Sequence, residues 1–159
     1  MWEPFQRYRA LDPNARRLFR SAALLLPMIR ASLRFRGYKK TQQWLQSRLA
    51  QQRAAFAGPA SPVSQPDQSL SITCRMVHSA AHYGPIRPTC LEESLALWYF
   101  LNDQGILSQL RIGVRKTDGK FEAHAWVEYQ GQTLNQSDEV HKHYAAFDSD
   151  LVEPPAGSA

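Results

Sequence analysis

Apolar residues recur at helical spacing along the first third of the chain. Asp12 precedes a proline, which is typical of a helix N-cap followed by proline at the first helical position. The apolar positions that follow lie three or four residues apart and include Leu18, Phe19, Ala22, Leu25 and Ile29. Pro27 is expected to kink or split this helix, Gly37 to end it, and Thr41 to cap a second helical segment.

The stretch GPASPVSQPDQS, at residues 58–69, interrupts this pattern. Prolines, serines and a glycine so close together predict a linker or a long loop. We therefore assign residues 1–58 to a basic helical N-terminal region and 59–69 to a linker. Residues 70–150 form a second region, and 151–159 are expected to be a disordered tail.

Two further helices are predicted after the linker. Apolar residues between Ile72 and Ala80 recur at helical spacing, and Gly84 ends that segment. Thr89 and Glu92 then match the capping-box pattern, in which the side chain of each residue bonds the backbone N–H of the other. The helix that they begin carries apolar residues at helical spacing: Leu91, Leu95, Trp98 and Leu101.

The period of the pattern then changes to that of strands. Residues 110–115 and 121–128 alternate apolar and polar side chains, and residues 133–136 are expected to return as a third strand. Asp118-Gly119 and Gln130-Gly131 predict the two short turns between them. The residues expected to face the core from the second strand are Phe121, Ala123, Ala125 and Val127. Helices followed by an antiparallel three-stranded meander predict an α+β fold.

Charge is distributed unevenly between the two halves of the chain. Residues 1–60 contain twelve Lys and Arg against two acidic residues, whereas residues 61–159 contain seven against twelve. A surface as basic as the first half attracts anions such as nucleic acid, anionic lipid, an acidic peptide or an acidic protein face. A solvated, arginine-rich helix surface explains the same composition without any partner.

Composition excludes several broad classes of protein. The 159 residues fit one domain, and a hydrophobic content of 43% excludes wholesale disorder. Two cysteines exclude a disulfide-stapled scaffold, and no apolar run reaches the roughly 18 residues that span a bilayer. The start of the chain lacks the features of a signal peptide, so we expect a cytoplasmic protein with reduced thiols.

We expect neither a cofactor nor a metal. His141 and His143 are two residues apart, but no second Cys or His pair follows at zinc spacing. His78 and His82 are four residues apart without completing a HEXXH motif. The sequence contains neither a Walker A loop nor a GxGxxG fingerprint.

Cys90 is the first candidate for chemistry because it directly follows Thr89, the predicted N-cap. A helix N-terminus carries unpaired N–H groups and partial positive charge. This setting lowers the pKa of a thiol and favours the nucleophilic thiolate, and the same N–H groups can bind an oxyanion. The alternative for Cys90 is a small buried hydrophobic residue, which is how we interpret Cys74.

His124 and Asn135 are the candidates for the base and for the group that orients it. His124 lies on the second predicted strand, on the face opposite its apolar residues, where a helix carrying Cys90 can pack. A thiol needs a base within hydrogen-bond reach. After a two-residue turn Trp126 lies opposite Asn135, and parity puts Asn135 on the face of His124. A register shift of one residue presents Gln136 instead. Ordinary polar strand positions are the alternative for both candidates.

The order of these features resembles the transglutaminase-like, papain-type cysteine superfamily. The resemblance rests on Cys90 at a helix start and on His124-Ala-Trp in the second strand of an antiparallel meander. In finer detail the chain is similar to the lasso-peptide biosynthesis B proteins, which are leader peptidases. The matching segments are RPTCLEESLALWYFL, LRIGVRK, FEAHAWVEYQGQTLN and YAAF, within residues 75–147. Residues 70–150 are therefore expected to form a transglutaminase-like cysteine peptidase core.

The resemblance implies a role for each candidate residue. Cys90 matches the nucleophile and His124 the general base of a peptidase that removes the leader from a lasso-peptide precursor through an acyl-enzyme. The family often carries Asn-Asp after the last strand, with the Asp as third member of the triad, but this chain reads Asn135-Gln136. We assign Asn135 as the third member, since Asn can orient a histidine, and keep Asp138 in reserve.

The resemblance also implies partners. The precursor peptide is the substrate, and family members work with a small separate leader-recognition protein and an ATP-dependent lasso cyclase. We expect the basic N-terminal half to dock an acidic partner or leader, so charge reversal at Arg16, Arg17 and Arg20 weakens that binding. We expect no nucleic-acid partner and, at most, a weak contact of the basic helices with a membrane surface.

Two other functions stay open on the sequence alone. The same Cys-His chemistry serves a transglutaminase or another acyltransferase that passes the acyl group to an amine, because the pocket chooses the acceptor. The second is a non-enzymatic binding module for nucleic acid or membrane, since Arg-rich helices with Trp2, Tyr8, Phe19 and Trp44 nearby suit that role. Salt-dependent DNA binding without thiol reactivity would favour the module.

Overall fold

The computed structural model describes residues 11–55, 66–117, 120–135 and 145–146. Its elements, in chain order, are α2 (Pro13–Ala55), α3 (Pro66–Tyr83), α4 (Cys90–Asp103), β1 (Gln109–Thr117), β2 (Lys120–Tyr129), β3 (Gln132–Thr133) and β4 (Ala145–Ala146). Several predicted features lie outside the described residues, namely the Asp118-Gly119 turn, Gln136, Asp138, His141, His143 and the tail at 151–159.

Helix α2 begins as its sequence predicts and turns back at a glycine. The Asp12 carboxylate accepts a hydrogen bond from the Asn14 backbone N–H at 3.0 Å, which confirms the N-cap. Gly37 is the residue inside α2 with a non-helical backbone, at φ 77°, a conformation that costs glycine little. Pro27 lies within the helix without dividing it, so of the two predicted outcomes, a kink or a split, the split is excluded.

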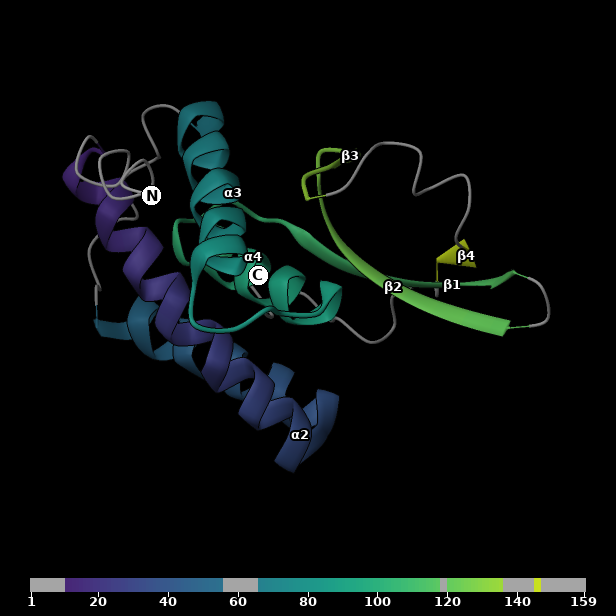
Figure 1. Ribbon diagram of the computed structural model, residues 1–159. Coiled ribbons are helices and arrows are strands. Elements are labelled where there is room, and N and C mark those ends of the chain that lie inside the picture. The colour runs from purple at the N-terminus through teal and green to yellow at the C-terminus, as the bar shows by residue number, and fades with distance from the viewer. Residues whose placement is uncertain (1–10, 56–65, 118–119, 136–144, 147–159) are drawn as a thin grey trace, which may run out of the picture.

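The turn at Gly37 divides α2 into two arms, residues 13–36 and 38–55. Figure 1 shows them as the purple and blue helices, the second folding back beside the first. Thr41 is buried one turn into the second arm, where its hydroxyl contacts the Gly37 carbonyl at 2.8 Å and the Ser32 hydroxyl at 2.9 Å. Thr41 therefore ties the two arms together, and the prediction that it caps the second arm is wrong.

One hydrophobic core joins the helices to the base of the sheet. Its fully buried members come from both arms of α2, from α3, from α4 and from β2, among them Leu26, Ile29, Leu45, Val77, Leu97 and Val127. Helix α3 starts at Pro66, inside the stretch 59–69 that the sequence predicts as a linker. The stretch thus connects two parts of a shared core.

The sheet is antiparallel, with strand order β3-β2-β1-β4. The predicted three-stranded meander is confirmed, and β4 adds a fourth strand beside β1. Gln130 and Gly131 both have positive φ, at 50° and 79°, as the turn between β2 and β3 requires. At the start of β2, the ladder between β1 and β2 pairs Thr117 with Lys120.

Strand β2 is buried only near its end. Ala125, Trp126 and Val127 are buried in succession, whereas Phe121 and Ala123 are exposed. Figure 1 shows the reason: the β1–β2 hairpin extends away from the helices, so its outer half has no helix against it. The prediction that Phe121 and Ala123 face the core is therefore wrong, because alternation gives the face of a strand and not how far the core reaches along it.

In the part of the chain that the structure describes, none of the helices is both long enough and apolar enough to span a bilayer.

Candidate active site

Cys90 is the first residue of α4, and the capping box that precedes it is fully formed. The Thr89 hydroxyl accepts from the Glu92 N–H at 3.4 Å, and a Glu92 carboxylate oxygen accepts from the Thr89 N–H at 2.7 Å. The Thr89 carbonyl accepts from the Glu93 N–H at 3.0 Å. These bonds leave the N–H groups of Cys90 and Leu91 as the helix-start donors suited to a developing oxyanion.

An arginine from the first arm of α2 clamps this helix start. Arg30 donates two hydrogen bonds to the Glu92 carboxylate, from Nε at 3.0 Å and from Nη2 at 2.8 Å. The same Nη2 contacts the Arg87 carbonyl, three residues before Cys90. Arg30 therefore fixes both the loop that leads to the cysteine and the turn that follows it.

The pKa of Glu92 reflects this clamp. Burial alone raises the pKa of the carboxyl, since the side chain is only 7% exposed. The hydrogen bonds from Arg30 and Thr89, together with the charge of Arg30, outweigh burial, so the pKa lies below its usual value. The Glu92 carboxylate is thus held ionised within the first turn of α4.

We expect the Glu92 clamp to be lost in acid. Because its pKa is lower in the folded state, the carboxylate stabilises the fold fully above its unfolded pKa of about 4.3. That contribution disappears as the pH falls through the folded value. The melting temperature of the wild type should therefore drop more steeply than that of Glu92→Gln between about pH 5 and pH 3. Parallel curves would contradict this, and Asp67→Asn, at an exposed carboxylate of α3, is the control.

The second acidic residue of the first turn is also paired with a base. Glu93 lies 3.1 Å from Nδ1 of His78, which comes from α3. Two carboxylates beside Cys90 would by themselves disfavour a thiolate. Because the guanidinium of Arg30 compensates Glu92, the positive end of the α4 dipole acts on Cys90 with less opposition.

Helix α4 is fastened to β2 one turn beyond Cys90. Ser94 is fully buried, and its hydroxyl donates to the Ala125 carbonyl at 3.0 Å. Residues four apart lie on the same face of a helix, so Cys90 and Ser94 share the face that meets β2. His124 precedes Ala125 directly. Cys90 and His124 therefore lie on two elements in contact, on either side of one buried hydrogen bond.

His124 is half-buried, at the point where β2 enters the core. Its ring lies nearly parallel to that of Trp126, at 20° and a centroid separation of 6.3 Å. Trp126 is fully buried, and its indole N–H donates to Glu128 at 2.8 Å. Glu128 in turn accepts from Arg111 at 3.0 Å. This chain holds the indole beside the imidazole and limits the positions open to His124.

The register predicted for the β2–β3 turn is confirmed as far as Thr133, which pairs with Glu128. The Leu134 N–H donates to the Val127 carbonyl at 2.9 Å. Because β3 ends at Thr133, the pairing of Asn135 with Trp126 stays a prediction. The amide of Asn135 has two partners of its own. Its oxygen accepts from the Val127 N–H at 2.9 Å, and its nitrogen donates to the Ser94 hydroxyl at 2.8 Å. Asn135 thus bridges α4 and β2, and its role in orienting His124 stays a prediction.

Sequence reasoning did not identify Arg30, Ser94 or Glu128 as parts of this region. The capping box signalled Glu92, but Arg30 lies 62 positions earlier, and no local pattern links residues at that distance. Ser94 carries a weak signal, because it is a polar residue within an apolar helix face. Within the described residues, no group of three or more His, Cys, Asp or Glu lies close enough to hold a metal ion.

The fold and the site define a class of protein. A cysteine at the start of a helix that packs on an antiparallel meander carrying a histidine is the arrangement expected of cysteine-dependent acyl-transfer domains. The family model of the transglutaminase-like superfamily matches residues 32–148, well over half of the chain. The chain therefore belongs to the transglutaminase-like superfamily, which includes cysteine peptidases. Searches of curated proteins and of solved structures gave no match.

Proposed function

We propose that this protein is a cysteine peptidase that removes the leader peptide from a lasso-peptide precursor. The observation that carries the proposal is Cys90, at the first position of a fully capped helix whose face is bonded to the strand of His124. Membership of the transglutaminase-like superfamily supports cysteine-dependent acyl chemistry. The resemblance of residues 75–147 to the lasso-peptide B proteins supports the choice of substrate.

The proposed reaction proceeds through an acyl-enzyme. His124 accepts the thiol proton of Cys90, and the thiolate attacks the carbonyl carbon of the peptide bond between leader and core. The helix-start N–H groups stabilise the oxyanion. His124 then gives its proton to the leaving amine, and the C–N bond breaks. Water, deprotonated by His124, attacks the thioester, which releases the carboxylate of the leader and returns the proton to Cys90.

The proposed partners follow from the substrate. A precursor peptide is cleaved, a separate leader-recognition protein presents it, and an ATP-dependent cyclase consumes the freed core. The ten basic and no acidic side chains of α2 favour an acidic leader or an acidic partner protein.

Mass spectrometry of a precursor digest tests the proposal. The full chain is incubated with a short precursor encoded beside its gene and with the matching leader-recognition protein. We expect a leader and a core whose masses sum to the precursor plus one water. Cys90→Ser should leave the precursor intact, and Cys74→Ser should cleave it normally. A product that carries an added amine in place of water would assign acyl transfer instead and overturn the peptidase proposal.

Thiol labelling offers a test that needs no substrate. Burial raises the pKa of the Cys74 thiol to about 11, whereas Cys90 is half-buried at a helix start. We expect iodoacetamide at pH 7 to 8 to label Cys90 and to reach Cys74 only as the pH approaches 10 to 11. The chain has two cysteines, so peptide masses assign each label. Equal labelling of the two in the folded protein would contradict the expectation; in urea both should react alike.

A further inference from the structure

A groove follows the first arm of α2, bounded by the second arm and, at its inner end, by α3 and α4. The proposed chemistry does not use this part of the molecule. A hollow of about 1080 Å³ at its inner end continues into one of about 400 Å³ near the turn, and Met28 lines both. The first arm contributes one continuous face, formed by Arg17, Ser21, Leu24, Met28 and Phe35. The facing arm contributes Trp44, Arg48 and Gln52.

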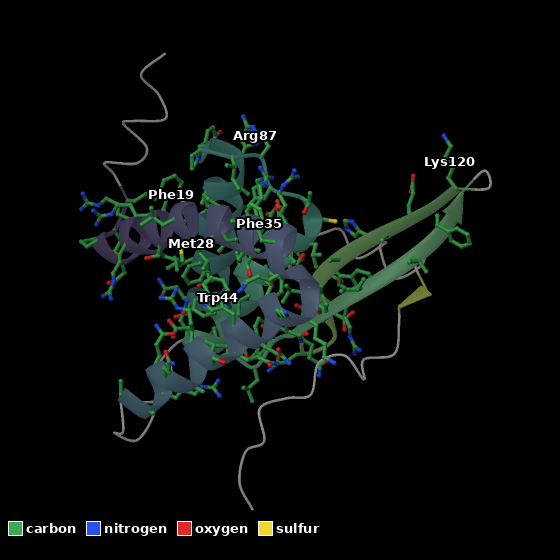
Figure 2. The ribbon with its side chains drawn as sticks, turned by 90° about the horizontal axis from the view of Figure 1, so that it is seen from below. Phe19, Met28, Phe35, Trp44, Arg87 and Lys120 are labelled. Carbon is green, nitrogen blue, oxygen red and sulfur yellow. The ribbon has the colours of Figure 1, made fainter. Side chains whose placement is uncertain are left out.

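Large apolar side chains stand exposed along this groove. Phe35 is 82% exposed, Leu24 71% and Met28 46%. Figure 2 looks onto this side of the molecule, with Met28 and Phe35 on the first arm and Trp44 on the second. Apolar side chains gathered along one groove, rather than scattered singly, are typical of a binding surface.

The charge around the groove is mainly positive. Helix α2 carries ten Arg and Lys and no Asp or Glu. Arg17, Arg36 and Arg48 line the hollows themselves, and Arg48 lies over the Trp44 ring at 5.6 Å. Two carboxylates, those of Asp12 and Asp103, lie at the inner end of the larger hollow. An acidic occupant is therefore attracted along most of the groove, and most strongly towards the turn.

The shape of the groove points to a polypeptide. The face from Arg17 to Phe35 spans about 27 Å at helical rise, the length of about eight residues of extended chain. Its walls alternate apolar side chains with amides and hydroxyls, which suit a peptide backbone. A membrane-surface helix buries an apolar face in the lipid interface, whereas these apolar side chains line a hollow. Phosphate groups are bound by cations, amides and hydroxyls, which would leave the exposed Leu24, Met28 and Phe35 without a role.

We propose that this groove is an exosite that binds an acidic polypeptide segment carrying large apolar side chains. Tyr99 and Asp103, near the C-terminal end of α4, line its inner end. Cys90 opens the same helix, about 20 Å from Asp103 at helical rise. A segment bound here is held away from the nucleophile, so the groove recognises a region remote from the scissile bond. Because the segment bound here would belong to the proposed precursor peptide, this inference rests on the proposed function.

Fluorescence anisotropy with designed peptides tests the groove directly. The probe is a fluorescein-labelled peptide of alternating Glu and Leu, about eight residues long to match the extended length of the groove. Two matched peptides replace Leu by Ser or Glu by Lys. The protein is the full chain with Cys90→Ser, so binding is measured without turnover. A failure of the peptidase proposal would therefore leave the binding result unaffected. We expect the Glu/Leu peptide to bind most tightly, with an affinity that falls as salt is raised.

Matched variants locate the binding. We expect Phe35→Ser and Arg36→Glu each to weaken binding of the Glu/Leu peptide by about tenfold. Phe121→Ser, at an exposed aromatic on the β1–β2 hairpin, and Arg75→Glu, at an exposed base on α3, should leave it unchanged. Unchanged binding by the groove variants would overturn the proposal. So would equal binding of the Lys/Leu peptide, or preferential binding to vesicles of anionic phospholipid or to single-stranded DNA.

Discussion

Replacing His124 with alanine is expected to abolish peptide cleavage and to slow alkylation of Cys90 at neutral pH. In sites where a base activates a nucleophile, loss of the base lowers kcat by at least about 10³-fold. His124 and Cys90 lie on elements joined by the Ser94–Ala125 hydrogen bond, so we expect the imidazole to take the thiol proton. The measurement pairs the cleavage rate with the pH profile of iodoacetamide labelling.

Two comparisons make the His124 result specific. His82→Ala removes an exposed histidine of α3 and should change neither measurement. The double variant Cys90→Ser with His124→Ala should lose no more activity than Cys90→Ser alone, because the two residues act as a unit. If His124→Ala cleaved the precursor at the wild-type rate, the assignment of the base would be wrong.

Replacing Arg30 with methionine is expected to slow the alkylation of Cys90 at pH 7. Without the guanidinium, the Glu92 carboxylate stands uncompensated in the helix turn that begins at Cys90, and its negative charge opposes a thiolate there. The alkylation rate at pH 7 should therefore fall on the order of tenfold. Iodoacetamide labelling at pH 7, followed by mass spectrometry of the Cys90 peptide, measures the rate.

Further variants separate this electrostatic effect from a general loss of structure. Arg30→Lys keeps the charge but not the two-pronged contact, so it should recover most of the wild-type profile. In Arg30→Met with Glu92→Gln, the uncompensated charge is gone and the alkylation rate at pH 7 should return towards that of the wild type. Arg34→Met, one turn along the same arm and exposed, is the matched control. If Arg30→Met melted as the wild type does and kept its labelling profile, the clamp would have no part in thiol activation.

Local signals in the sequence predicted the parts of the site that depend on neighbouring residues. The Thr89–Glu92 pair gave the helix start and the place of Cys90, because a capping box closes within four residues. The Gln130-Gly131 turn gave the register that pairs Glu128 with Thr133 and Tyr129 with Gln132. In both cases hydrogen bonds between residues close in sequence set the geometry. The residue types that form such bonds can be recognised in the sequence itself.

The remaining features depend on packing that no local pattern records. Pro27 lies inside a helix because tertiary contacts override its preference as a breaker, while the break falls at Gly37. Phe121 alternates as a core residue does, yet the helices end before they reach it. Arg30 meets Glu92 only once the first arm of α2 crosses the start of α4. Contacts between residues far apart in sequence determine these three features.

The first arm of α2 also changes what counts as the smallest working unit of this protein. The superfamily match begins at residue 32, two residues after Arg30. A fragment cut at that limit would keep the cysteine, the histidine and the sheet. It would lose the guanidinium that secures the start of α4, together with Leu26 and Ile29 of the core. The segment that matches the superfamily is thus shorter than the segment that builds the core and holds the start of α4, and the difference is most of the first arm of α2.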